Sequence, residues 1–100
     1  MGLGLLYVTH PNKKEAEVLC NSLLDEKLIA CANLFPIDSI FNWENKKTKE
    51  NEVVSLIKFN KNKIEEIEKR IKELHSYEIP CIIRISASAN NEFENWVNDQ

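Results

Sequence analysis

Residues 62–85, NKIEEIEKRIKELHSYEIPCIIRI, join a helix to a strand through one stiff connection. Apolar residues recur in the first half at spacings of three, four and three, which gathers them in one stripe along a helix. These apolar residues are Ile64, Ile67, Ile71 and Leu74. Pro80 fixes its own backbone angle and pushes Ile79 toward extended conformations, so the helix must end before a strand at 81–85 begins. Asn62 and Glu65 have the spacing of a capping box, which predicts the start of this helix.

The connection carries three polar side chains within four residues: His75, Tyr77 and Glu78. Because the connection is short and directed, these side chains can converge on one partner. His75 has two open interpretations: imidazole suits copper, nickel and zinc as a ligand, and a histidine at a helix end also donates to the last carbonyls. Glu78 supplies a second ligand or pairs with a lysine of a neighbouring subunit. Tyr77 is suited to anchor an interface through its ring and hydroxyl.

The beginning of the chain predicts a buried strand followed by a helix. Residues 3–9 form a short apolar run, closed by the turn His10-Pro11-Asn12. A lone histidine in such a turn is most often a solvated loop residue. Asn12 and Glu15 have capping-box spacing, so a helix should start there. Its predicted buried face consists of Ala16, Leu19, Cys20, Leu23 and Leu24.

The middle of the chain predicts one long antiparallel hairpin. Residues 29–35 have the composition of a strand that Pro36 interrupts with a bend, and the strand resumes at 39–44. A polar, lysine-rich tip at 45–51 then leads into a return strand at 52–59.

Alternate strand residues face opposite sides, so Phe41 and Trp43 share one face of the hairpin, while Ile40, Asn42 and Glu44 share the other. A tryptophan on the outer half of a hairpin needs cover, and a partner chain can provide it. We therefore interpret Trp43 and Glu44 as subunit-contact residues.

The predicted order is strand, helix, strand, strand, helix, strand, with a short terminal helix at about 92–98. This is the split βαβ arrangement of an α+β, ferredoxin-like fold. Two helices should cover one face of the antiparallel sheet, which leaves aromatic and β-branched residues uncovered on the other face. Exposed apolar sheet is a liability unless something packs on it, so self-association is predicted. The terminal helix should gather Phe93, Trp96 and Val97 on one face.

Length and charge limit the class of protein. One hundred residues with 43% hydrophobic side chains are enough for a single packed domain, 1–100. The net charge of −3 disfavours nucleic acid, because phosphate binding draws on a surplus of clustered lysine and arginine. No apolar run approaches the ~20 residues that cross a bilayer, and no secretory signal opens the chain. We therefore expect a cytoplasmic protein without membrane contact.

The three cysteines, Cys20, Cys31 and Cys81, lack Cys-x-x-Cys spacing, so neither a disulfide framework nor a zinc ribbon is predicted. Free buried thiols are the simplest interpretation. Ala30 and Ala32 indicate close packing around Cys31, although a ligand role stays open. No serine, cysteine or carboxylate has an identifiable base and orienting partner, so we expect no enzyme.

Four segments, in this order and spacing, resemble the divalent-cation tolerance family CutA, small trimeric proteins whose fold is similar to that of the PII signalling proteins. Together they span nearly the whole chain. They are Val8-Thr9-His10-Pro11-Asn12, Lys27-Leu28-Ile29-Ala30-Cys31-Ala32-Asn33, Ile40-Phe41-Asn42-Trp43-Glu44-Asn45-Lys46 and His75-Ser76-Tyr77-Glu78-Ile79-Pro80.

The chain departs from the family pattern at three single positions, and its loop at 89–91 only loosely matches the family's Gly-Asn segment. Asn45 stands where the family usually has glycine, and asparagine is the other residue that best tolerates left-handed angles. Ser76 replaces the usual proline of the family's His-Pro-Tyr-Glu motif. Cys81 stands where the family commonly has glutamate, and its thiol there strengthens soft-metal binding or simply packs.

The resemblance implies a PII-like homotrimer linked to tolerance of copper and other divalent ions, without established catalytic activity. It also places the strand end at His10 near the subunit cleft. On this basis we expect copper or another divalent ion to be bound by His75, Glu78 and Cys81. The expected residues of the subunit interface or cleft are Cys31, Trp43, Glu44 and Tyr77. The alternative is a PII-like metabolite-sensing module that acts through a partner protein.

Overall fold

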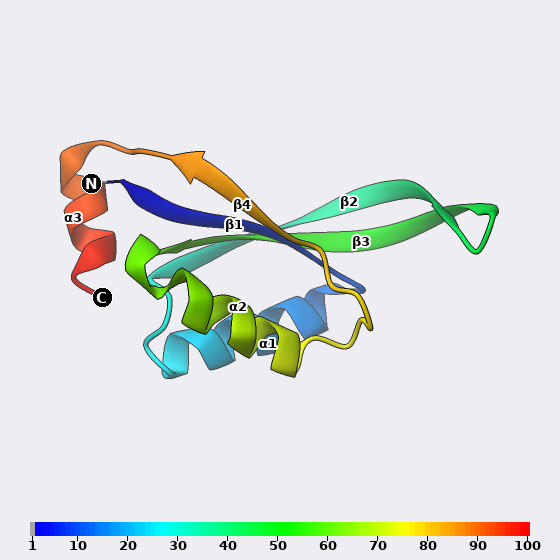
Figure 1. The fold of residues 1–100 in the computed structure, drawn as a ribbon, viewed down its shortest axis with the longest axis horizontal. Coiled ribbons are helices and arrows are strands. Elements are labelled where there is room, and N and C mark those ends of the chain that lie inside the picture. Colours follow the sequence, from blue (N-terminus) through cyan, green and yellow to red (C-terminus); the bar gives the residue numbers. More distant parts are fainter. Residues whose placement is uncertain (1) are drawn as a thin grey trace.

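A four-stranded antiparallel sheet carries two helices on one face, and a third helix lies at the end of the sheet away from the hairpin tip (Figure 1). The computed structural model describes residues 2–100. In chain order the elements are β1 (Leu3–His10), α1 (Lys13–Asp25), β2 (Cys31–Trp43), β3 (Lys46–Phe59), a 3-10 turn (Lys61–Lys63), α2 (Ile64–Leu74), β4 (Ile82–Ala87) and α3 (Asn91–Asn98). This confirms the predicted α+β, ferredoxin-like order with a long hairpin and a terminal helix.

The strand order is β2-β3-β1-β4, so β1 lies inside the sheet between β3 and β4. Alternate residues of β1 and β3 face the two helices and form the core with them. The fully buried members include Leu6, Val8, Ile57 and Phe59 of the sheet, Leu23 of α1, and Ile67 and Ile71 of α2. The apolar periodicity of both helices thus places them on one face of the sheet.

The helix start at Asn12 is confirmed, because its side-chain oxygen accepts a hydrogen bond from the amide of Glu15 at 2.9 Å. The predicted capping box at Asn62 is wrong. Asn60 caps instead, accepting from the amide of Asn62 at 3.0 Å, and the 3-10 turn leads into α2. Leu24 also departs from the prediction, since it is 39% exposed at the edge of the α1 stripe.

The hairpin of β2 and β3 is more regular than predicted. Pro36 does not interrupt β2, whose pairing with β3 continues through that position. β2 lies at the sheet edge, where a residue without an amide hydrogen is tolerated. The predicted seven-residue tip is also wrong, because the strands are joined by Glu44 and Asn45 alone, both with positive φ (51° and 65°). Polarity misled the prediction, because the lysine-rich residues after Asn45 are paired strand.

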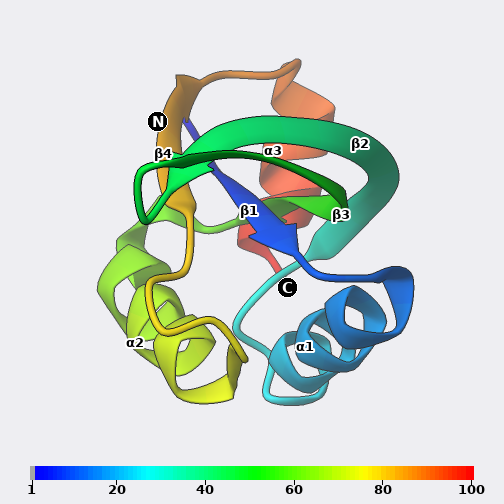
Figure 2. The same ribbon diagram turned by 90° about the vertical axis from the view of Figure 1, so that its right-hand side faces the viewer.

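The sheet face opposite α1 and α2, called here the open face, presents large apolar side chains to solvent. They are Phe35, Phe41, Trp43, Ile83 and Ile85, each at least 38% exposed. Figure 2 shows α1 and α2 together on one side of the sheet. Helix α3 contacts one end of the open face, where Lys58 of β3 lies 5.6 Å from the ring centre of Phe93. The rest of this face has no layer over it within residues 2–100.

The left-handed turn yields a stability prediction. Asn45→Ala should lower the free energy of unfolding by about 1 kcal/mol, because alanine is strained at positive φ, whereas Asn45→Gly should not destabilise. Urea unfolding at one fixed protein concentration measures both changes. Asn51→Ala, an exposed change within β3, is the matched control. Equal stability of the two Asn45 variants would contradict the strain at this position.

Candidate functional site

His75 sits where α2 ends, and its ring connects that end to β1. Its amide donates to the carbonyl of Ile71 at 2.8 Å. Ring atom Nδ1 accepts from the amide of Tyr77 at 3.0 Å, and Nε2 lies 2.7 Å from the carbonyl oxygen of Thr9. A carbonyl only accepts, so Nε2 carries the hydrogen and the ring is the neutral Nε2–H tautomer. Both nitrogens are therefore engaged with the backbone.

His10 lies under the ring of His75, stacked at 5.2 Å between ring centres and 14° between planes. Its Nε2 is 2.7 Å from the hydroxyl of Ser55, and the residue is 1% exposed. Its interpretation as a solvated loop residue is wrong, because β1 continues to residue 10 and His10 shares the buried face of Leu6 and Val8. Burial, and then the neighbouring His75, lower the pKa of His10 from 6.5 to about 4.

Tyr77 joins the connection between α2 and β4 (residues 75–81), called here the corner, to the hairpin. Its hydroxyl donates to Oε2 of Glu52 in β3 at 2.6 Å, and its ring centre lies 4.8 Å from that of His75. Burial raises the pKa of the Tyr77 hydroxyl, as do the hydrogen bond to Glu52 and the charge of that carboxylate. Sequence reasoning missed Glu52, because nothing in its neighbourhood marks it as the partner of a residue 25 positions away.

The Ser55–His10 pair resembles half of a nucleophile and base arrangement, but it is closed to substrate. Ser55 is 0% and His10 1% exposed. Cys20 of α1 is also buried, and burial raises the pKa of its thiol, an effect that the Ser55 hydroxyl partly offsets. His10 and Ser55 thus form a polar connection between β1 and β3 within the core.

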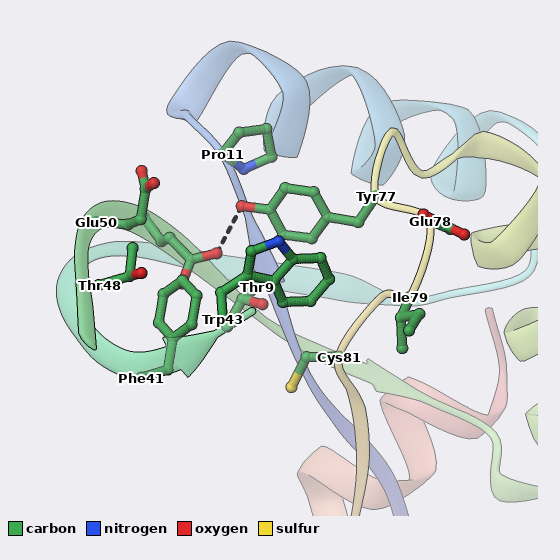
Figure 3. Close-up of a pocket in the computed structure, with 11 residues that line it drawn as sticks. Thr9, Pro11, Phe41, Trp43, Thr48, Glu50, Tyr77, Glu78, Ile79 and Cys81 are labelled. Atoms are coloured by element: carbon green, nitrogen blue, oxygen red, sulfur yellow. Dashed lines mark hydrogen bonds between the residues drawn. The ribbon is translucent and has the colours of Figure 1, made fainter. Parts of the chain in front are cut away.

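The corner and the open face of the hairpin meet at a hollow of about 520 Å³ (Figure 3). We call it the corner pocket. Its lining residues are Thr9, Pro11, Phe41, Trp43, Thr48, Glu50, Glu52, Tyr77, Glu78, Ile79 and Cys81. A volume of this size lies in the range of small-molecule sites. The open face and the corner thus contribute jointly to one cavity.

Four of the predicted site residues line this pocket, and three do not. Trp43, Tyr77, Glu78 and Cys81 lie on its wall. The others are Cys31, half-buried at the start of β2, Glu44, exposed in the hairpin turn, and His75, directed toward β1. Among residues 2–100, no group of three or more histidine, cysteine or acidic side chains is placed to hold a metal ion.

The topology, the extended hairpin and the pocket at its base define a small α+β protein of the ferredoxin-like, PII-like class. Comparison with known families is more specific: the model of the CutA1 divalent ion tolerance protein matches residues 4–100. The chain belongs to the CutA1 family.

Relatives and solved structures agree with this assignment. The divalent-cation tolerance protein CutA of Archaeoglobus fulgidus is 38% identical over 97 residues, covering 96% of this chain and 95% of the relative. A CutA1 crystal structure from Ehrlichia chaffeensis superposes with a TM-score of 0.94 at 37% identity, covering 98% of this chain and 94% of the other. The PII-like protein CutA from Nostoc sp. PCC 7120 superposes with a TM-score of 0.90 at 29% identity, covering 96% of this chain and 94% of the other.

The relatives are described as belonging to different compartments. The Archaeoglobus protein of known structure is called periplasmic, and the Arabidopsis thaliana relative is called chloroplastic. Within residues 2–100, no helix combines the length and apolar character needed to cross a membrane.

The buried His10 predicts acid sensitivity. Its pKa is about 4 in the folded protein against 6.5 when unfolded, so the unfolded chain binds more protons between these values. The stabilising effect is complete above pH 6.5 and is lost as the pH falls toward 4, by roughly 3 kcal/mol. Urea unfolding across this range measures it.

His10→Phe is the control, because it keeps a ring on His75 but cannot titrate. The variant should lose about 1–3 kcal/mol of stability at neutral pH, since Ser55 loses a partner. Its slope between pH 4 and 6.5 should be smaller, so its deficit against the wild type should shrink or disappear toward pH 4. A slope equal to that of the wild type would assign the acid sensitivity to other groups.

Proposed function

We propose that this protein is a non-enzymatic homotrimer that responds to divalent cations, copper among them, and binds the ion or a small ligand at clefts between subunits. We also propose that residues 1–100 form a single domain and that the protein acts in the cytoplasm. The observation that carries this proposal is the open face, which exposes large apolar side chains beside the corner pocket. The names of the relatives, divalent-cation tolerance proteins, support the link to metal ions.

Assembly would cover large apolar side chains that the single chain exposes to solvent. The hairpin extends beyond the sheet body (Figure 1), and the molecule measures 45 × 24 × 21 Å. Trp43 near its end is 53% exposed and Ile83 of β4 is 49% exposed. Covering such side chains with another subunit gains about 25 cal/mol for each Å² of apolar surface buried. Trp43, Glu44 and Cys31 are the proposed contact residues, and Tyr77 borders the cleft.

For the metal, we propose the corner residues His75, Glu78 and Cys81 of one subunit, completed by groups of the next. Glu78 and Cys81 already line the pocket. His75 would coordinate only after exchanging its hydrogen bond to Thr9 or to Tyr77 for the metal. Thiolate and imidazole ligands favour copper over hard cations such as magnesium.

A second candidate is a metabolite-sensing role that acts through a partner protein. The size of the corner pocket favours it, as does the similarity to a neighbour described as PII-like. Fold analogy alone is weak support for function. A thermal-shift screen of nucleotides against copper, zinc and magnesium ions separates the two candidates, because each predicts a different stabilising compound.

The proposed assembly predicts that a charge on the open face prevents it. Ile83→Glu should shift the sedimenting species from three chain masses toward one at micromolar concentration, because an unpaired carboxylate resists burial. Val18→Glu is the matched control, since Val18 is a similarly exposed residue of α1 on the other side of the sheet. A wild-type monomer, or equal effects of both changes, would contradict the proposal.

The proposed metal site predicts weaker copper binding when a corner residue is removed. His75→Ala, Glu78→Gln and Cys81→Ser should each lower copper affinity by about tenfold or more, measured by calorimetric titration. Glu66→Gln, an exposed change on α2, is the control. Unchanged affinity in all three corner variants would move the metal site elsewhere.

A further inference from the structure

The corner pocket combines aromatic walls with side chains that carry only negative charge. Among its eleven lining residues, three are aromatic and three are glutamates, and none is a lysine, arginine or histidine. The aromatic residues are Phe41, Trp43 and Tyr77, and the glutamates are Glu50, Glu52 and Glu78. A hollow with apolar walls and only negative charge is complementary to a cation that also has an apolar body.

The aromatic walls are held in place from two directions. Phe41 and Trp43 point to the same side because they alternate along β2, whose register with β3 is continuous to the turn. Tyr77 is held by its hydrogen bond to Glu52 and by ring contact with His75. Figure 3 shows the rings of Trp43 and Tyr77 bordering the hollow, with the Tyr77–Glu52 hydrogen bond beside them. Aromatic faces attract cations within about 6 Å of the ring centre.

The negative charge of the pocket comes mainly from β3. Glu52 keeps a second carboxylate oxygen besides the one bonded to Tyr77, and within residues 2–100 Glu50 enters no ion pair. Both carboxylates contribute to the raised pKa of the Tyr77 hydroxyl, after burial and its hydrogen bond. Glu78 lies at the rim, and its carboxylate points away from Trp43 in Figure 3.

We propose that the corner pocket binds a small organic cation, an amine or quaternary ammonium with an apolar body. A bare divalent ion needs several convergent donors, and no such group exists among residues 2–100. A large, weakly hydrated ammonium needs aromatic faces and diffuse negative charge instead, which this pocket supplies. The inference rests on the proposed ligand cleft and names the class of ligand that this cleft takes.

The test uses choline and its uncharged analogue 3,3-dimethyl-1-butanol, which has the same shape without the charge. Saturation-transfer NMR and calorimetric titration on the purified full chain should show saturable choline binding, with the analogue about tenfold weaker or worse. Trp43→Leu should lose about tenfold in choline affinity, and Trp43→Phe should recover part of it. Trp96→Leu is the matched control, because that exposed tryptophan lies outside the pocket.

A second variant tests the role of charge in the pocket without changing the size of a side chain. Glu50→Gln keeps the size of the side chain and should weaken choline while leaving the neutral analogue unchanged. Sedimentation of every variant, with copper titration beside it, distinguishes the two proposals. An intact trimer that binds copper but not choline would overturn this inference alone, whereas a monomer that binds no copper would overturn the proposed function.

Two further outcomes would also overturn the inference. Equal affinity for choline and its neutral analogue would show an apolar pocket without charge selection. If choline bound only after Lys46, Lys47 and Lys49 were replaced by alanine, the pocket would be occupied by the hairpin of a second copy.

Discussion

The ring of His75 is the constraint on which the corner depends. It accepts from the amide of Tyr77 and donates to the carbonyl of Thr9, so one side chain fixes the end of α2, the path of the connection and the end of β1. His10 supports the ring from below and is itself held by Ser55. Buried polar groups of this kind specify one arrangement because each has its partner. The position of Tyr77, and with it one wall of the corner pocket, follows from this constraint.

The fold was largely predictable because it follows from short-range patterns. Apolar spacing identified both main helices, and strand alternation placed Phe41 and Trp43 on one face. The errors arose where tertiary context decides. An edge position accommodates Pro36 within a continuous strand. Positive φ was expected at Asn45 but not at Glu44, and these two residues alone close the hairpin. Composition alone contains neither fact.

The site was predictable only in its location. The crowding of polar groups before Pro80 indicated the corner, and four of the seven expected residues line the pocket. The roles of the histidines depended on long-range contacts: His10 meets Ser55 across 45 residues, and His75 meets Thr9 across 66. No local pattern encodes such pairings, although strand parity with Val8 would have placed His10 inside the core.

The contacts of His10 and His75 separate the residues that hold the fold from the residues that line the pocket. Because both histidines hold the corner, the proposed cation binding would depend first on the carboxylates, aromatic rings and Cys81 thiol that line the pocket. None of these groups belongs to the buried core cluster, so we expect most replacements among them to change the pocket and not the topology. Cys81 illustrates this: at that wall its thiol is a softer donor than a carboxylate would be. Ligand preference can therefore differ between chains whose folds superpose closely.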